Sequence, residues 1–467
     1  MYAKAALHAK TRRVLYKGHP LHRSAPPRPS RMVTLAELHA HRDRGWVALA
    51  DGKIYDLTHF ARVHPGGEHI IHALAGRDAA DLFRAFHPNI PSEARAHAML
   101  KRLPVVAYLD ADDADRSPLQ RDLNQLRTAL EQDGSYRTSA AFYLAQAAWL
   151  SLLLTAALSL TLAATTLAQT VFVAAASALF LQQTAFVGHD AGHSAITHRR
   201  GWDRAIGLLV GPVLTGLSIS WWRDSHNTHH VVTNEAENDP DIQHLPVLCV
   251  IQQAVQRGGL KSSYHRKHFL IDNVARFFVR WQAVLCAPLL LVSRFNLYVQ
   301  SVAWFFSWRA ARVRRRDAAL ELALIGLHHL GVALLVAQLP GWGLRLAWYL
   351  GTNCLASILN IQIVSSHFGM DVLDKSEDVG RDAQFLRQQL VTTTDISTTA
   401  ASAWFFGGLQ HQVAHHVFPR IPRHRLRGLA GRLKVLCKQH GVEYREDSFG
   451  GILLGVWRAL ARVADAL

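Results

Sequence analysis

Residues 141–187 contain no charged side chain, and this stretch restricts the possible folds of the chain more than any other feature. It reads AFYLAQAAWLSLLLTAALSLTLAATTLAQTVFVAAASALFLQQTAFV. One membrane-spanning helix needs roughly 20 apolar residues, so the stretch is more than twice that length. We therefore predict two spanning helices joined by a short turn near Leu167. A second pair of spans is predicted at about 320–339 and 344–364, separated by the PGWGLR segment.

Basic residues predict how these spans are oriented. The two short turns within the pairs carry almost no charge, whereas the long segments before 141, between 188 and 317 and after 366 hold the arginines, including RAARVRRR. By the positive-inside tendency, both termini and the central segment face the cytosol. The formal charge of +16 suits an anionic cytosolic leaflet, and no segment resembles a nucleic-acid-binding module.

Two further features of composition bear on the class of protein. The four cysteines form no CxxC pair, so we expect unpaired thiols and no disulfide framework. The first 30 residues are basic and contain no acid, and no apolar stretch follows the charges, which argues against a cleaved secretory signal. We interpret residues 1–32 as a disordered basic tail, with a transit peptide or a start at Met32 as the alternatives.

The segment after this tail has the features of a small haem-binding module. Residues 46–60 alternate apolar and polar side chains around Asp51-Gly52, which predicts a β-hairpin. His64 precedes a Pro-Gly-Gly turn, and His87 ends an amphipathic helix before a proline. An apolar slot with one imidazole on each wall is predicted between them, lined by Phe60, Ile70, Leu74, Leu82 and Phe83. The alternative is a pair of surface histidines at helix ends.

This segment resembles the cytochrome b5 family over nearly its whole length. The resemblance places the HPGG motif at 64–67 and the second axial ligand at His87. It implies that His64 and His87 hold a haem b through both axial positions. Haem iron with two histidine ligands has no open site and carries single electrons.

Histidines recur in groups directly after the predicted spans. His226, His229 and His230 stand at i, i+3 and i+4, which is one face of a helix, and His189 and His193 stand at i and i+4. His367 follows the fourth predicted span, and QHQVAHH adds His415 and His416. An even number of spans precedes each group, so all of them are predicted on the same cytosolic side of the membrane.

The number of imidazoles indicates two metal ions. Neutral imidazole suits zinc, copper, iron or nickel, and eight or nine ligands are too many for one tetrahedral zinc. An electron-carrying haem module fused to zinc would have nothing to reduce. We therefore predict a pair of irons.

The boxes HxxxH, HxxHH and QxxHH, in this order after a cytochrome b5-like module, resemble the front-end membrane desaturases over about residues 33–440. The segments DPDIQHLP, RFNLYV, SSHFGM and GGLQHQVAHHVFPRIPRH are most similar to the sphingolipid delta-8 members. The resemblance implies that the iron ligands are His189, His193, His226, His229, His230, His367, His415 and His416. Gln412 takes the first place of the third box. His411 beside it departs from the usual aromatic residue, and we place it outside the ligand set.

The implied fold is an N-terminal α+β cytochrome b5-like haem domain, then an all-α membrane desaturase domain with four transmembrane helices and a cytosolic helical cap. The domain boundaries are 1–32 for the tail, 33–110 for the haem domain, 111–140 for a linker, 141–440 for the desaturase domain and 441–467 for a C-terminal tail. Residues predicted to orient the ligating histidines are Asp190, Asp224, Asn227, Asn234, Asp239 and Asp241. Trp221, Trp222 and Phe186 are candidate walls of a substrate tunnel, or anchors at the membrane interface.

The implied activity is O2-dependent desaturation of a lipid chain in the endoplasmic reticulum membrane, with haem domain and histidine boxes in the cytosol. NADH-cytochrome b5 reductase would supply electrons through the haem to the two irons. The favoured substrate is the long-chain base of a ceramide, desaturated at delta-8, and the alternative is a delta-6 or delta-5 fatty acyl substrate. A lipid hydroxylase, which would use the same histidines and haem and differ only in its product, ranks below both. A membrane metal transporter also ranks below both, because the predicted spans hold few polar residues.

Overall fold

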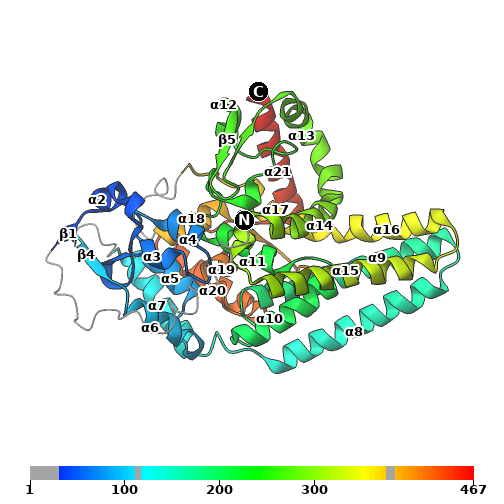
Figure 1. Ribbon diagram of the computed structural model, residues 1–467, viewed down its shortest axis with the longest axis horizontal. Helices are drawn as coiled ribbons and strands as arrows, with labels where there is room; N and C mark the ends of the chain where they lie inside the picture. Colours follow the sequence, from blue (N-terminus) through cyan, green and yellow to red (C-terminus); the bar gives the residue numbers. More distant parts are fainter. Residues whose placement is uncertain (1–30, 111–116, 375–383) are drawn as a thin grey trace, which may run out of the picture.

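The computed structural model describes residues 31–110, 117–374 and 384–467. Most of the predicted basic tail, residues 1–30, lies outside the described residues. The N-terminal domain lies at one end of the molecule and an arm of long helices at the other, with a compact helical region between them (Figure 1).

The N-terminal domain combines a sheet with short helices, as the sequence predicts. The strand order is β1 (Met32–Val33), β4 (Val105–Leu109), β3 (Lys53–Asp56) and β2 (Trp46–Ala48), with β1 parallel to β4 and the other pairs antiparallel. Asp51 and Gly52 have φ of 63° and 68°, which lets the β2–β3 hairpin turn tightly. The helices are α2 (Leu35–Ala40), α3 (Thr58–Ala61), α4 (Glu68–Leu74), α5 (Ala80–Phe86) and α6 (Ala94–Leu100).

The predicted linker 111–140 contains a helix, α7 (Pro118–Gln132). The Ser117 side chain accepts a hydrogen bond from the backbone N–H of Gln120 at 3.1 Å and caps this helix. Leu119 and Leu123 of α7 are buried in one apolar cluster with Leu433 of α20 (Leu426–Gln439). The linker therefore packs on the C-terminal part of the chain.

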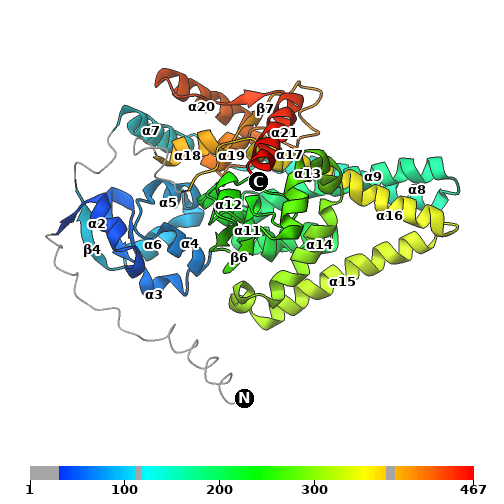
Figure 2. The ribbon, with the colours of Figure 1, turned by 90° about the horizontal axis from the view of Figure 1, so that it is seen from above.

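Four long helices form the arm, and they run side by side in both views (Figures 1 and 2). They are α8 (Ala140–Ala163), α9 (Leu167–Gly192), α15 (Arg315–Ala337) and α16 (Trp342–Ala356), and α9 packs against both α8 and α16. The three longest have the length and composition of membrane spans, which confirms the first predicted pair and the third span. The Thr166 side chain accepts the Gln169 N–H and starts α9, close to the predicted turn.

The fourth predicted span comprises two consecutive helices. Residues 344–364 fall in α16 and α17 (Ile358–Phe368), which only Ser357 separates, and Ser357 itself has a helical backbone and donates its N–H to the Asn353 carbonyl at 3.1 Å. Among the described residues, α13 (Asn273–Leu291), in the central segment that is predicted to be cytosolic, is also long and apolar enough for a span, whereas neither α16 nor α17 is so by itself. The Ser357 side chain, between α16 and α17, accepts a hydrogen bond from the backbone N–H of Arg294 at 3.2 Å. This bond links the start of α17 to helix α14 (Ser293–Ala303).

The central region holds the remaining helices and two small strand pairs. The chain after residue 140 is therefore mostly helical. Its other helices are α10 (Arg200–Leu208), α11 (Ile219–Val231), α12 (Gln252–Gln256), α18 (Gln384–Thr392) and α19 (Gln412–Val417). The strand pairs are antiparallel β5 (Gly259–Ser262) with β6 (Lys267–Leu270), and parallel β7 (Asp395–Ile396) with β8 (Glu446–Asp447).

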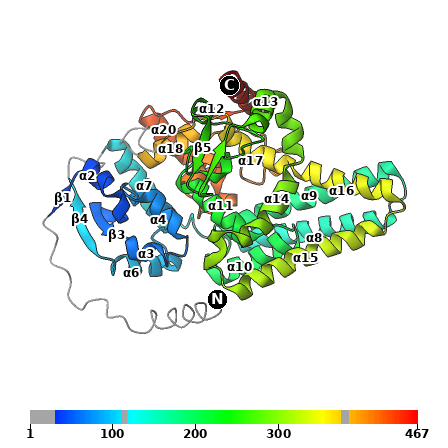
Figure 3. The same ribbon diagram turned by 45° about the horizontal axis from the view of Figure 1, so that its top comes forward.

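The predicted C-terminal tail 441–467 forms an amphipathic helix, α21 (Phe449–Asp465), which packs on α13 and α17 (Figure 3). Gln282 of α13 donates a side-chain hydrogen bond to the Leu460 carbonyl at 2.8 Å. The end of the chain therefore belongs to the packed structure.

Candidate functional site

Eight buried histidines from four separate helices meet at one place in the central region. Seven of them form two groups whose nitrogen atoms lie within 4.8 Å of one another, namely His189, His193, His226 and His415 in one, and His229, His367 and His416 in the other. All eight residues are at most 7% exposed. The structure thus brings together every histidine that the sequence analysis assigned to the irons.

The eighth histidine, His230, lies between the two groups. Its Nε2 lies 3.1 Å from Nε2 of His226 and 3.0 Å from Nε2 of His415. Its ring also stacks on that of His416, with centroids 4.1 Å apart. His230 therefore contacts both groups, as expected for two ions held close together.

The ring nitrogens themselves indicate that metal fits here. Nδ1 of His230, both nitrogens of His193, and Nε2 of His367 and His416 are buried without a hydrogen-bond partner among the described residues. Leaving a buried polar atom unpaired costs about 1–3 kcal/mol, and several occur at one point. Burial also lowers the pKa of His230 and His416 well below the usual value, which keeps the neutral form that binds metal.

Helix α11 is fixed at its start by a carboxylate from α15. Glu321 accepts hydrogen bonds from the Ser220 backbone N–H at 2.9 Å and from the Ser218 hydroxyl at 2.6 Å. A negative charge at a helix N-terminus is favourable, and this one is buried. The first turn of α11 is thereby anchored, which sets the position of the three histidines on its later turns.

Several outer partners orient the imidazoles. Asp239 Oδ2 lies 2.8 Å from His229 Nδ1, and the Asp239 charge, acting against burial, raises the pKa of His229. Asp241 lies 3.6 Å from His226 Nδ1, so both aspartates stand where they were predicted.

Two outer partners come from α18, which carries no recognisable motif. The Thr392 carbonyl lies 3.1 Å from His367 Nδ1, and Gln389 Oε1 lies 3.0 Å from His416 Nδ1. Sequence spacing did not reveal these two residues, because their partners are distant along the chain.

The other predicted orienting residues have different surroundings. Asp190 is 3.8 Å from His189 Nδ1, and Asn234 donates to the His367 carbonyl at 3.0 Å. Asp224 does not face a ligating histidine, since it accepts hydrogen bonds from Arg309 and from Trp304 Nε1. The Asn227 side chain forms no hydrogen bond with the described residues.

Gln412, the first residue of the third box, and His411 beside it lie in different environments. Gln412 is 3% exposed and lines a narrow apolar cavity with Phe186 and Leu409. His411 instead lies 3.7 Å from Asp395, outside the two histidine groups. The two side chains therefore have different surroundings, and the role of Gln412 in the site stays a prediction.

Trp222 closes one side of the histidine groups. Its ring stacks on His226 with centroids 4.4 Å apart, and it lies 5.3 Å from His189. A Cβ atom at Gly192 would overlap the Trp222 ring, so glycine permits this close approach. Trp221 is buried in another cluster, against Trp304.

The N-terminal domain forms the predicted slot between two histidines. Nδ1 of His64 lies 3.2 Å from the Gly67 carbonyl, and Nδ1 of His87 lies 2.9 Å from Glu93 Oε2, which leaves Nε2 of each ring for an axial bond. Ile70, Leu74 and Leu82 are buried in one apolar cluster, with Phe60 and Phe83 packed against it. Burial lowers the pKa of His64 to about 4, so the neutral ligand form prevails.

The slot faces the histidine groups directly. The ring of Phe86, next to His87, lies 6.3 Å from the ring of His230, in an edge-to-face arrangement. Glu93 pairs with Arg420 at 2.9 Å and with Arg200 at 3.3 Å, both in the second domain. This interface could not be predicted from the sequence, because nothing in a single sequence pairs Glu93 with Arg420.

A second set of contacts holds the same two domains together. Arg77 donates two hydrogen bonds to Glu235, at 2.6 and 3.2 Å, and Glu235 is fully buried. His69 Nε2 lies 2.9 Å from the hydroxyl of Thr228, on the helix that carries three histidines. A bidentate pair of this kind fixes orientation as well as distance.

Comparison with known families agrees with this architecture. Residues 164–448 match the fatty acid desaturase family, and residues 34–110 match the cytochrome b5-like haem/steroid binding domain. The chain belongs to the fatty acid desaturase family and carries an N-terminal cytochrome b5-like domain. It is a membrane protein, an oxidoreductase that acts on lipid, and the family implies haem, iron and electron transfer through the fused domain.

Three similar proteins carry related names. The chain is 34% identical to the Delta(8)-fatty-acid desaturase of Helianthus annuus, over 89% of this chain and 88% of that one. It is 36% identical to the Delta 8-(E)-sphingolipid desaturase of Emericella nidulans, over 58% of this chain and 49% of that one. It is 30% identical to the Acyl-lipid (9-3)-desaturase of Borago officinalis, over 89% and 90%.

Proposed function

We propose that this protein uses O2 to introduce a double bond into a lipid chain at a pair of irons held by the eight histidines. The observation that carries the proposal is the convergence of two histidine groups, with unpaired buried nitrogens, around His230, which contacts both groups. When bound, the irons supply oxygen activation and removal of hydrogen from unactivated methylenes. The residues of this chain hold the ions, orient the imidazoles and exclude water.

The ligand set is proposed as His189, His193, His226, His229, His230, His367, His415 and His416. Gln412 precedes His415 and His416 by three and four residues and lines a narrow cavity with Phe186 and Leu409. We do not assign the Gln412 amide to either of the two histidine groups. We place Gln412 against the substrate chain, as a residue that positions it.

Electrons would arrive one at a time through a haem b held by His64 and His87. The supporting observation is the contact of Phe86 with His230, which puts the two sites one aromatic ring apart. NADH-cytochrome b5 reductase is the proposed donor. The enzyme would lie in the endoplasmic reticulum membrane, with the haem domain and histidines on the cytosolic side.

The proposed substrate is the long-chain base of a sphingolipid, desaturated at delta-8. Two of the similar proteins are named as delta-8 desaturases, one of them for a sphingolipid, which supports this choice. The similarity to an acyl-lipid desaturase supports the alternative of a delta-6 or delta-5 fatty acyl substrate.

The test is expression in a yeast that lacks delta-8 unsaturation of its sphingolipids, followed by mass spectrometry of long-chain bases and fatty acids. The proposal expects new double bonds in the long-chain bases. His415→Ala is the matched inactive control, since it removes one histidine of the larger group. New double bonds confined to fatty acids would refute the substrate, and hydroxylated products would refute desaturation.

A further inference from the structure

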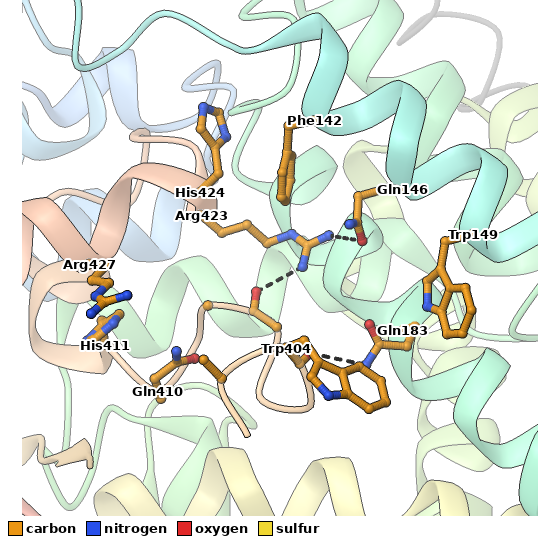
Figure 4. A pocket seen from close by; sticks show the side chains of 13 residues that line it. Phe142, Gln146, Trp149, Gln183, Trp404, Gln410, His411, Arg423, His424 and Arg427 are labelled. Carbon is orange, nitrogen blue, oxygen red and sulfur yellow. Dashed lines mark hydrogen bonds between the residues drawn. The ribbon is translucent and has the colours of Figure 1, made fainter. Parts of the chain in front are cut away.

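A pocket of about 520 Å³ lies next to the metal centre, with no role so far assigned to it (Figure 4). It is bounded by the first turns of α8, by the loop that carries Trp404 and Gln410, and by the segment that carries Arg423 and Arg427. Figure 4 shows the side chains of Phe142 and Gln146 facing the same space. Its position at the cytosolic end of a predicted span puts it at the proposed membrane surface.

Two links connect this pocket with the histidine groups. Arg423 donates from Nε to Asp190 at 2.8 Å, and Asp190 directly follows His189. His411 lines the pocket and precedes α19, which carries His415 one turn later. One helical turn advances about 5.4 Å, so a lipid whose head lay in this pocket would have its chain near the metal centre.

The pocket offers little positive charge to a ligand. All three nitrogens of the Arg423 guanidinium are used, for Asp190, for the Gly407 carbonyl at 2.8 Å and for Gln146 Oε1 at 3.0 Å. Burial lowers the pKa of His424, which keeps that ring neutral at pH 7. Arg427, at the exposed rim, has no salt bridge in the described part of the chain. A coenzyme A thioester, with several phosphates, would require more unpaired cations.

Uncharged hydrogen-bonding groups face the pocket instead. Gln410 is 4% exposed, and its Oε1 has no hydrogen-bond partner among the described residues, nor has either ring nitrogen of His424. Buried polar atoms of this kind need a partner, so the pocket is suited to a ligand with hydroxyl or amide groups. Trp149 and Trp404, with ring centroids 6.4 Å apart, add an aromatic wall of the type found at membrane interfaces.

We propose that this pocket binds the amide- and hydroxyl-bearing head of a ceramide-type lipid and so selects a sphingolipid over an acyl-CoA. The inference rests on the proposed function, because it assigns the substrate head to a place beside the same metal centre. Gln410 and His424 are the proposed hydrogen-bonding residues.

The experiment is photo-crosslinking of the purified full-length holoprotein in nanodiscs with a ceramide that carries a diazirine near its head, followed by mapping of the labelled peptides. The expected labels lie within 403–411 and 142–149, and added ceramide, not oleoyl-CoA, suppresses them. Gln410→Leu should weaken ceramide binding about tenfold, the range for removing one buried hydrogen bond. Gln252→Leu, at an exposed position on α12, is the matched control and should bind as the wild type does.

A second variant distinguishes a ligand with an uncharged head from a ligand whose head carries a phosphate. Arg427→Gln should change ceramide binding less than twofold, whereas a phosphate-bearing head would lose an ion pair. Labelling of other segments, competition by oleoyl-CoA, or a large effect of Arg427→Gln would each overturn the inference. Iron content and yeast lipid profiles report separately on the proposed function. If desaturated fatty acids form and this pocket is not labelled, the proposed desaturase activity is retained and the proposed ceramide site is refuted.

Discussion

Glu93 links the proposed haem ligand His87 to the desaturase domain, and its replacement by glutamine should change the haem reduction potential. The carboxylate is 1% exposed and lies 2.9 Å from His87 Nδ1. Although burial alone would raise the pKa of Glu93, its hydrogen bond with His87 and the charge of Arg420 hold that pKa at about 2. Glu93 therefore carries a full negative charge at neutral pH.

The size and sign of the effect follow from this charge. A buried anion beside the axial ligand stabilises the ferric form relative to the ferrous form, so Glu93→Gln should raise the potential. A hydrogen bond to a charged group contributes about 1.5–3 kcal/mol. Arg420 and Arg200 already offset part of the charge, and glutamine keeps an acceptor. We take about 1 kcal/mol, which for one electron is about 40 mV.

The assay is a spectroelectrochemical titration of the haem in the purified full-length protein. Glu37→Gln is the control, because Glu37 lies in the same domain and, among the described residues, its carboxylate accepts hydrogen bonds from Thr34 within its own capping box. The expected result is a rise of about 40 mV for Glu93→Gln and no measurable change for Glu37→Gln. A change of less than about 10 mV, or a fall, would refute the role assigned to Glu93.

Three further changes test the metal centre and its connection to the haem domain. Gly192→Ala should displace the Trp222 ring and reduce bound iron, whereas Gly201→Ala, which meets no atom within 4 Å, should retain it, as metal analysis would show. Phe86→Ala should slow reoxidation of the reduced haem in stopped-flow mixing with oxygen and lipid, with an unchanged haem spectrum, and an unchanged rate would exclude the Phe86 route. Asp239→Asn should weaken iron binding by about 10–100-fold in a chelator competition, and wild-type affinity would show that Asp239 does not support its histidine.

Local patterns could be predicted from the sequence because neighbouring residues set them. The Asp51-Gly52 hairpin, the slot between His64 and His87 and the helical face of His226, His229 and His230 all depend on spacing within a few residues. The groups of histidines also share a position after the spans. Their convergence into two groups agrees with that prediction.

Contacts between distant segments could not be predicted in this way. Gln389 and Thr392 support histidines although α18 has no motif, and Glu93 meets Arg420 only in the folded chain. Helix α13 was not predicted as a candidate span because Arg276 and Arg280 interrupt its apolar sequence. The C-terminal helix α21, by contrast, has an N-terminal signal in Ser448, which accepts the Gly451 N–H.

The most direct test of the central claim is the metal content of the purified full-length protein, measured by mass spectrometry together with its haem absorbance. The account predicts about three irons per chain, one in haem and two outside it, and loss of the two non-haem irons in a His230→Ala variant that retains its haem. Zinc in place of the non-haem iron, or one non-haem iron that survives the loss of His230, would contradict it.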